Sequence, residues 1–255
     1  YSAGVPLGTM STWGWHSFEN VEGFRPEDCY VPYDFGTGSK EALYSQQVSR
    51  KQAEEDPRLA EAADYLRANP HRLHLGNVGF LMPDGVTVDS LTDVDQTLDL
   101  LSGVDNTAFT LRGQHYTVNT FCHPEKDEVG VFIEYSNEPL PLLIRIPGPT
   151  GKHSDDASDW STSPEVTIED NSVAVPYGYH IDVQSLTGCS LSARDRGEGV
   201  VSCEASDTHR LALTLRWRDD KGDATATPCQ PAEIWEANRQ KWYDFWHNGA
   251  VVDFS

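Results

Sequence analysis

The sequence predicts a mainly β fold, an antiparallel β-sandwich with accessory helices and a helix near the C-terminal end. Between His71 and Trp217, short runs of alternating apolar and polar residues recur with turn signals about every 8–12 residues, as in sandwich proteins. Helical material is expected around 40–68 and 233–247, with one ambiguous segment at 89–101, so strands and helices do not alternate as a parallel sheet requires. A chain of 255 residues can also bury a substantial core.

The first 70 residues indicate a loop region followed by helix. Residues 1–38 are rich in glycine, proline and aromatic residues, and we expect an ordered loop, because a flexible linker would not carry so many aromatic side chains. Residues 40–68 are rich in Ala, Glu and Gln and predict a helical insertion that Pro57 divides in two. The second piece, Pro57 to Ala68, has Asp56 as its expected N-cap.

The strands follow from His71 onward. They are expected at 108–111, 115–122, 129–135, 142–146, 166–168, 173–175, 179–183, 190–194, 200–204 and 210–217. The segment 89–101 is ambiguous, because its apolar residues stand at roughly helical spacing. We expect exposed loops at 150–163 and 218–229.

The end of the chain predicts a strong helix over Glu233–His247. Its apolar stripe consists of Ile234, Trp235, Trp242, Phe245 and Trp246. A helix with three tryptophans must pack on something large, either here or in a following domain. We therefore expect a sandwich domain over 1–230 and a linker helix over 231–255, and the ending at Ser255 looks like a domain boundary.

The charge of the chain excludes several classes of partner. A net charge of −21, from 40 acidic and 19 basic residues, repels phosphate backbones and anionic membranes, so we expect no nucleic acid and no membrane partner. No apolar run approaches the roughly 20 residues that cross a bilayer. An acidic surface of this kind fits a secreted or extracellular protein or a salt-adapted one, or it serves only solubility. The lack of an Asn-x-Ser/Thr sequon argues mildly against secretion.

Five cysteines are present, and none of them forms a CxxC pair, so a zinc ribbon has no support. Cys189 and Cys203 flank the turn-rich stretch 194–199, and a hairpin there would place the two thiols opposite each other. The alternatives for this pair are a disulfide and two buried free thiols. No metal site and no cofactor signature is evident.

The densest group of candidate site residues is Trp13-Gly14-Trp15-His16. Two indole faces beside a histidine complement a sugar ring, which offers an apolar C–H face and hydroxyl groups. The alternative is that both tryptophans belong to the core.

A second group, Asn69 to Gly76, contains His71, Arg72 and His74 as hydrogen-bond donors, but it lacks the further ligand that a metal would need. Its alternatives are a structural hydrogen-bonding role and recognition of substrate hydroxyl or carboxylate groups. Cys122-His123-Pro124 predicts a structural corner rather than a catalytic pair, because adjacent strand residues point to opposite faces.

Several long blocks resemble six-hairpin glycosidase-like proteins. These blocks are Pro6–Phe18, Asn69–Gly76, Gln96–Leu100 with Gly103-Val104, and Cys122–Pro124, followed by Trp242–Trp246 as the likeness of a linker helix. Such proteins are similar in architecture to disaccharide phosphorylases and trehalases, in which a β-sandwich of the super-sandwich type precedes an (α/α)6 barrel. This chain departs from the group in two ways: it lacks the Gly-Asn-Gly strand before Pro6, and the barrel with its general acid would lie beyond Ser255.

The resemblance implies the non-catalytic N-terminal domain of a glycoside hydrolase, inactive alone and without a cofactor. Its partners would be an oligo- or polysaccharide and the (α/α)6 barrel of the same enzyme. The domain would orient that barrel and contribute edge residues to a carbohydrate pocket. The candidate residues are Trp13, Trp15, His16, Arg72 and His74. The alternatives are a stand-alone carbohydrate-binding module, the same domain of a disaccharide phosphorylase, and a sandwich that touches no substrate.

Overall fold

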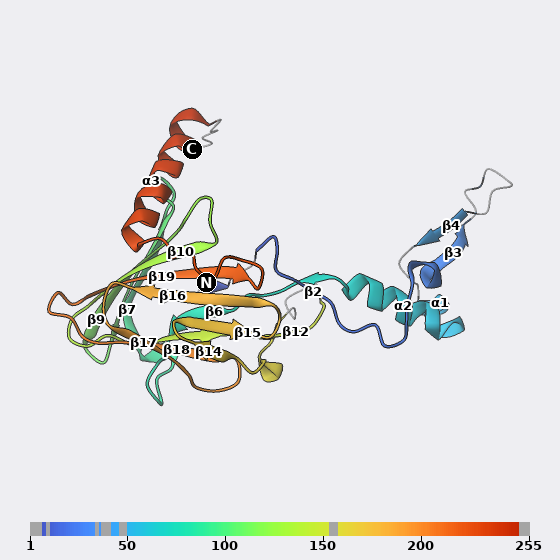
Figure 1. The fold of residues 1–255 in the computed structure, drawn as a ribbon, viewed down its shortest axis with the longest axis horizontal. Helices are drawn as coiled ribbons and strands as arrows, with labels where there is room; N and C mark the ends of the chain where they lie inside the picture. Colours follow the sequence, from blue (N-terminus) through green and yellow to red (C-terminus); the bar gives the residue numbers. More distant parts are fainter. Residues whose placement is uncertain are drawn as a thin grey trace. The chain divides into compact units, whose positions relative to one another are not determined.

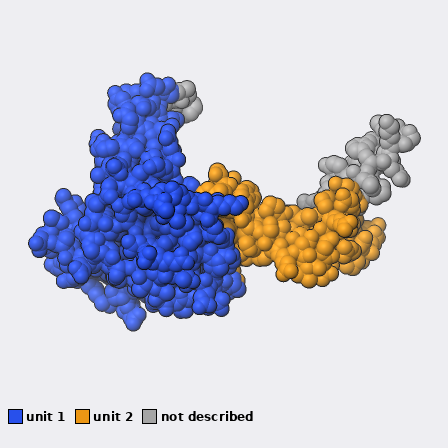
Figure 2. All heavy atoms as spheres, viewed as in Figure 1, with its two compact units in different colours: residues 1–11, 75–148, 160–255 blue, residues 12–74, 149–159 orange. Residues whose placement is uncertain are grey.

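The computed structural model describes residues 7–8, 11–33, 36, 42–45, 50–152 and 158–249. It divides into two compact units, which Figure 2 draws in blue and orange. Unit 1 comprises residues 1–11, 75–148 and 160–255, and unit 2 comprises residues 12–74 and 149–159. The expected boundary between a domain over 1–230 and a linker over 231–255 stays a prediction.

Unit 1 contains a large sheet of eight strands in the order β14-β15-β16-β19-β10-β9-β8-β7 (Figure 1). Its strands are β7 (Leu91–Asp99), β8 (Val104–Leu111), β9 (Gln114–Cys122), β10 (Glu128–Tyr135), β14 (Thr167–Glu169), β15 (Ser172–Val175), β16 (Tyr179–Ser185) and β19 (Arg210–Asp219). Neighbouring strands pair antiparallel throughout. The predicted hairpin series at 108–135 is thereby confirmed as β8, β9 and β10.

A second sheet of unit 1 has five strands in the order β1-β6-β11-β18-β17, also antiparallel. Its strands are β1 (Leu7–Gly8), β6 (Asn77–Phe80), β11 (Leu142–Arg145), β17 (Cys189–Ala193) and β18 (Glu198–Cys203). Unit 1 also contains short 3₁₀ turns at Val88–Ser90 and Trp160–Thr162 and the helix α3 described below.

The core of unit 1 lies between these two sheets. The ring of Phe80 on β6 lies 5.5 Å from that of Phe109 on β8 and 6.2 Å from that of Tyr116 on β9, and all three are buried. Farther along, Gly199 of β18 approaches Val173 of β15 so closely that an added Cβ would lie 3.0 Å from a valine methyl group. Each fully buried apolar side chain contributes about 1.5–3 kcal/mol. The prediction of a mainly β, antiparallel sandwich is confirmed.

The ambiguous segment 89–101 is a strand, β7, at the edge of the large sheet. A bulge between Thr92 and Asp95 inserts one extra residue opposite β8. It disturbs the alternation of apolar residues, and both Val94 and Leu98 are exposed. The segment is a strand because its backbone pairs with β8, and the local sequence pattern does not reveal that pairing.

Unit 2 contains the short helices α1 (Arg50–Glu55) and α2 (Pro57–Ala68). The carboxylate of Asp56 accepts the backbone N–H of Leu59 at 3.2 Å, so the predicted N-cap and the predicted break both occur. The expected helix is wrong at Ala42–Ser45, which forms strand β4 and pairs with β3 (Tyr30–Tyr33). There, pairing overrides the local helical propensity.

The remaining elements of unit 2 are two further strands, β2 (Trp15–His16) and β5 (His71–Arg72), and a 3₁₀ turn at Pro26–Cys29. A further short pair consists of β12 (Gly148–Pro149) and β13 (Ser158–Asp159). The small core of unit 2 consists of Cys29, Leu59 and Ala62, with Phe24, Ala63 and Leu66 packed around them.

Helix α3 (Pro231–Asn248), drawn in red in Figure 1, packs on the large sheet with its first turns. Ile234 is fully buried against Val104 and Phe121, and Trp235 lies edge-on to the Phe121 ring at 5.0 Å. Its later turns contact the β7–β8 turn, where Trp246 Nε1 donates to the carbonyl of Leu100 at 2.6 Å. The predicted helix over 233–247 is confirmed, while residues 250–255 of the expected linker lie outside the described residues.

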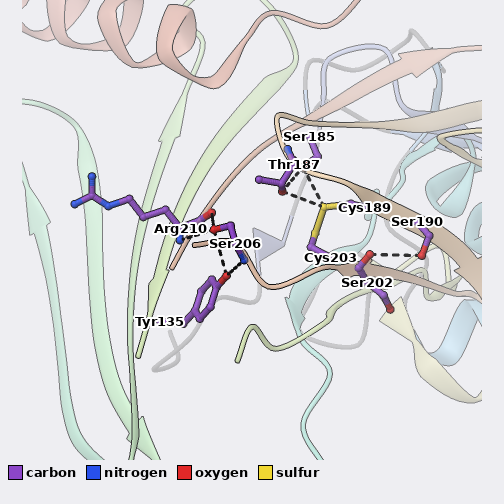
Figure 3. The surroundings of a disulfide bond; sticks show 9 residues. All are labelled: Tyr135, Ser185, Thr187, Cys189, Ser190, Ser202, Cys203, Ser206 and Arg210. Carbon is purple, nitrogen blue, oxygen red and sulfur yellow. Dashed lines mark hydrogen bonds between the residues drawn. A yellow bond between two sulfur atoms is a disulfide. The ribbon is translucent and has the colours of Figure 1, made fainter. Parts of the chain in front are cut away.

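A disulfide joins Cys189 and Cys203, which face each other across the β17–β18 hairpin (Figure 3). Ser185 Oγ lies 3.0 Å from Cys189 Sγ. The bond closes a short loop, which in the chain-entropy account contributes about 3 kcal/mol. In the described part of the chain, none of the helices has both the length and the apolar character needed to cross a membrane.

Candidate functional site

The two sequence groups of candidate residues come together in unit 2. Strand β2 pairs antiparallel with β5, so that Trp15 lies opposite Arg72 and His16 lies opposite His71. The backbone N–H of Leu73 donates to the carbonyl of Gly14 at 2.9 Å and extends this pairing. Segments more than 50 residues apart in the sequence thus share one short ribbon. We call the residues Trp15, His16, His71 and Arg72 the ribbon site.

Trp15 offers an indole surface held in one orientation. Its Nε1–H donates to the carbonyl of Thr12 at 2.8 Å. The guanidinium carbon of Arg72 lies 5.2 Å from the ring centroid, a cation–π distance. The residue nevertheless stays 48% exposed, far above the exposure of a core tryptophan. An apolar face and several N–H donors therefore lie side by side at the surface of unit 2.

His16 and His71 form a hydrogen-bonded pair beneath this surface. His71 is buried, and its Nδ1 lies 2.8 Å from the carbonyl oxygen of Ala68. A carbonyl only accepts, so His71 Nδ1 carries the proton, and its Nε2 accepts from His16 Nδ1 at 3.3 Å when both rings are neutral. Burial, and secondarily the charge of His71, lower the pKa of His16 below its ordinary value. This environment therefore disfavours the protonated form of His16.

Phe18 and the end of α2 hold the ribbon site in place. The backbone N–H of Phe18 donates to Asn69 Oδ1 at 2.7 Å, and Tyr65 Oη donates to the carbonyl of Phe18 at 3.0 Å. The Phe18 ring lies 5.1 Å from each of the two histidine rings. Gly151 also packs here, because an added Cβ would lie 3.0 Å from the Phe18 ring. The surface loop is therefore fixed by the helix and not free to rearrange.

Of the five predicted site residues, the structure joins Trp15, His16 and Arg72 in the ribbon site. Trp13 and His74 lie in the same unit and are half-buried. Burial lowers the pKa of His74. His71, the most buried member, belonged to the second donor group of the sequence but was not among the five candidate residues. One histidine in each of two short extended segments is the signal that could have identified it.

The Cys122-His123-Pro124 segment is a corner between β9 and β10, as predicted. His123 Nδ1 accepts the backbone N–H groups of Glu125 and Lys126, both at 3.1 Å. This nitrogen is thereby used to shape the turn. Burial raises the pKa of the Cys122 thiol, which makes it a weak nucleophile.

A second polar cluster, in unit 1, was not anticipated. Asp182 accepts hydrogen bonds from Ser172, at 2.7 Å, and from the guanidinium groups of Arg216 and Arg218. Burial opposes the charged form, but these hydrogen bonds outweigh it and keep the pKa of Asp182 below its ordinary value. The cluster lines a cleft of about 520 Å³. Because both arginines bind the same carboxylate, we interpret it as a structural ion network on the face of the sheet.

Among the residues that the structure describes, no three His, Cys, Asp or Glu side chains converge as ligands for a metal ion. No family model matches the chain, and no curated protein matches it. Among solved structures, a "Putative kojibiose phosphorylase from human microbiome" is similar over 69% of this chain, with 11% identity and a TM-score of 0.39. The chain spans about a quarter of that protein, since the match covers 25% of its length.

Proposed function

We propose that this chain is the non-catalytic β-sandwich domain of a glycoside hydrolase and that its ribbon site forms part of a carbohydrate-binding surface. The observation that carries the proposal is the exposed, fixed indole of Trp15 beside the guanidinium of Arg72. The enzyme class rests on the resemblance of the sequence blocks to six-hairpin glycosidase-like proteins. Two of those blocks supply the two strands of the ribbon.

The chemistry of the ribbon site suits a sugar. A pyranose ring stacks its C–H face on an indole, while its hydroxyl groups accept hydrogen bonds from a guanidinium. The hydrogen bond from Trp15 to Thr12 and the packing of Phe18 order the site before any ligand arrives. Such ordering reduces the entropy lost on binding. A charge of −21 disfavours a phosphate co-substrate, so we prefer hydrolysis to phosphorolysis.

Helix α3 supports the second part of the proposed role, which is to orient a catalytic (α/α)6 barrel. It lies against the sandwich along one side, yet Tyr243 and Phe245 are 55% and 48% exposed. Exposed aromatic residues on a firmly packed helix fit a surface that a further domain covers. We place the general acid in that barrel and the whole enzyme outside the cell.

A second candidate, a stand-alone carbohydrate-binding module, is favoured by one observation. Every residue of the ribbon site and its support comes from unit 2, so the site needs no further domain. In that case the isolated chain would bind sugar with its full affinity. In the enzyme proposal, the barrel adds contacts and the chain alone binds weakly.

The test is ligand binding by saturation-transfer NMR and tryptophan fluorescence with a panel of α- and β-linked gluco-oligosaccharides. We expect Trp15→Ala to weaken binding about tenfold, the loss of about 1.4 kcal/mol. Trp160→Ala is a matched control, because Trp160 also lies under an arginine, Arg145, at 4.8 Å, but in unit 1. Equal effects of the two substitutions, or no binding by the parent chain, would count against the ribbon site.

A further inference from the structure

Lys126 and Cys229 approach each other unusually closely in unit 1. Lys126 Nζ lies 2.8 Å from Cys229 Sγ, although the two residues are 103 positions apart. Sulfur is larger than oxygen, so N–H···S hydrogen bonds are longer than N–H···O bonds, whose donor–acceptor distances run from about 2.7 to 3.2 Å. The contact is therefore shorter than an ordinary hydrogen bond to sulfur.

Both residues are held in this position by their backbones. The N–H of Lys126 donates to His123 Nδ1 within the β9–β10 turn. Cys229 donates its own N–H to Glu128 Oε2 at 3.2 Å and accepts from Thr214 Oγ1 at 2.7 Å. The lysine side chain is exposed and the thiol half-buried, so a small oxidant reaches the pair from solvent. The closeness is a property of the fold at this point.

The electrostatics of the pair leave the thiol protonated at rest. Burial raises the pKa of Cys229, and the nearby Lys126 ammonium opposes that rise without cancelling it. The hydrogen bond to the thiol raises the pKa of Lys126. The resting thiol is therefore mostly protonated, and the pair reacts slowly with hydroperoxide, through the fraction of thiolate that the neighbouring ammonium stabilises.

We propose that Lys126 and Cys229 form a redox modification site, in which hydroperoxide joins them through a single oxygen atom as a lysine–cysteine N–O–S bridge. The sulfur first attacks one peroxide oxygen, the O–O bond breaks, and RSH + H₂O₂ gives RSOH + H₂O. A second peroxide then removes two electrons as the sulfenic oxygen bonds to the amine nitrogen: RSOH + R′NH₂ + H₂O₂ gives RS–O–NHR′ + 2 H₂O. The proton of the resting ammonium passes to water. A separation of 2.8 Å leaves room for one bridging oxygen, whereas a direct S–N bond needs a much closer approach.

The bridge would tie the start of helix α3 to the β9–β10 turn. Cys229 lies two residues before Pro231, the first residue of α3, and Lys126 lies in the turn between two strands of the large sheet. Oxidation would thus fix the base of the helix covalently and raise the midpoint of thermal unfolding of unit 1. Reduction would release it. This inference is independent of the ribbon site.

The test is mass spectrometry of peptides from the peroxide-treated chain, cut with a protease that does not cleave at lysine. We expect a linked peptide pair containing residues 126 and 229, heavier by about 14 Da than the two reduced peptides together, and separated by dithiothreitol. Lys126→Arg keeps the positive charge and should abolish the link, as should Cys229→Ser. Lys241→Arg, at an exposed lysine of α3, and Cys122→Ser should leave it intact.

Three results would overturn the proposal. The first is a linked peptide pair lighter by about 2 Da than the two reduced peptides, which indicates a direct S–N bond. The second is a disulfide between Cys122 and Cys229, and the third is oxidised Cys229 without any cross-link. Circular dichroism of each variant before oxidation checks that it is folded. Lys126→Arg changes one exposed side chain, so the comparison stands even if Cys229→Ser folds poorly.

Discussion

Replacing Gly103 with alanine tests how helix α3 is attached to the sandwich. Gly103 lies in the β7–β8 turn with φ +64°, and an added Cβ would stand 1.8 Å from Trp242 Nε1. Alanine therefore meets two separate penalties at this position. One is the left-handed backbone, and the other is a collision with the indole ring of Trp242 on α3.

The size of each penalty can be worked out. The left-handed conformation costs an L-residue about 1–2 kcal/mol. Forcing an extra carbon into a packed contact costs about 1–3 kcal/mol more. We therefore expect Gly103→Ala to lower the free energy of unfolding by about 2–5 kcal/mol. Gly113→Ala is the matched control, because Gly113 has φ +77° and nothing within 4 Å of its added Cβ, so only the first penalty applies.

Urea unfolding, followed by far-UV and near-UV circular dichroism, measures both variants. The near-UV signal reports the tryptophans of α3, so it should change more in Gly103→Ala than in Gly113→Ala. In a Trp242→Ala background, the two glycine substitutions should cost the same within about 0.5 kcal/mol. If Gly103→Ala and Gly113→Ala are already equal in the parent chain, the helix does not rest on this turn and our description of α3 fails.

Two other predictions concern stability. Ile234→Ala should lower the free energy of unfolding in urea by about 2–5 kcal/mol, because Ile234 is fully buried. Val88→Ala, at a site that is 81% exposed, should lower it by about 0.5 kcal/mol or less. Similar losses at both sites would contradict the packing of α3. His16, whose pKa is lowered, takes up a proton more readily when unfolded, so the free energy of unfolding should fall as pH drops below about 6.5. His16→Gln should flatten that decline below about pH 6.5, and an unchanged slope would contradict the lowered pKa of His16.

The strands that the sequence predicted best are those whose pattern and turns agree. In β8 and β9, buried and half-buried residues alternate, and the turn at Arg112-Gly113 has the positive φ angles that such a hairpin requires. In these two strands the local sequence pattern is sufficient to predict the structure. At β7 it is not, because the bulge near Asp93 disturbs the alternation. At β4, the composition favours a helix, but pairing with the partner strand β3 makes the segment a strand.

The ribbon site was predictable in its residues but not in its assembly. Trp15 and Arg72 stand out as residue types that bind sugars, yet their pairing depends on the register between distant segments. No local periodicity encodes that register. The contact between Lys126 and Cys229 was not predictable for the same reason, because the two residues are far apart in the sequence and no local pattern links them.

We propose that this chain is one domain of a larger glycoside hydrolase, and the most direct test of that claim is the effect of Trp15→Ala on kcat/KM and on thermal stability of the proposed enzyme. If the ribbon site contributes to the substrate pocket, kcat/KM falls about tenfold or more, and Tm changes by about 2 °C or less because Trp15 is half exposed. Trp160→Ala should leave kcat/KM within about twofold of the parent enzyme. The opposite pattern would contradict the account: a stability loss of about 3–5 kcal/mol, the scale of a core tryptophan, with unchanged kinetics of the folded fraction.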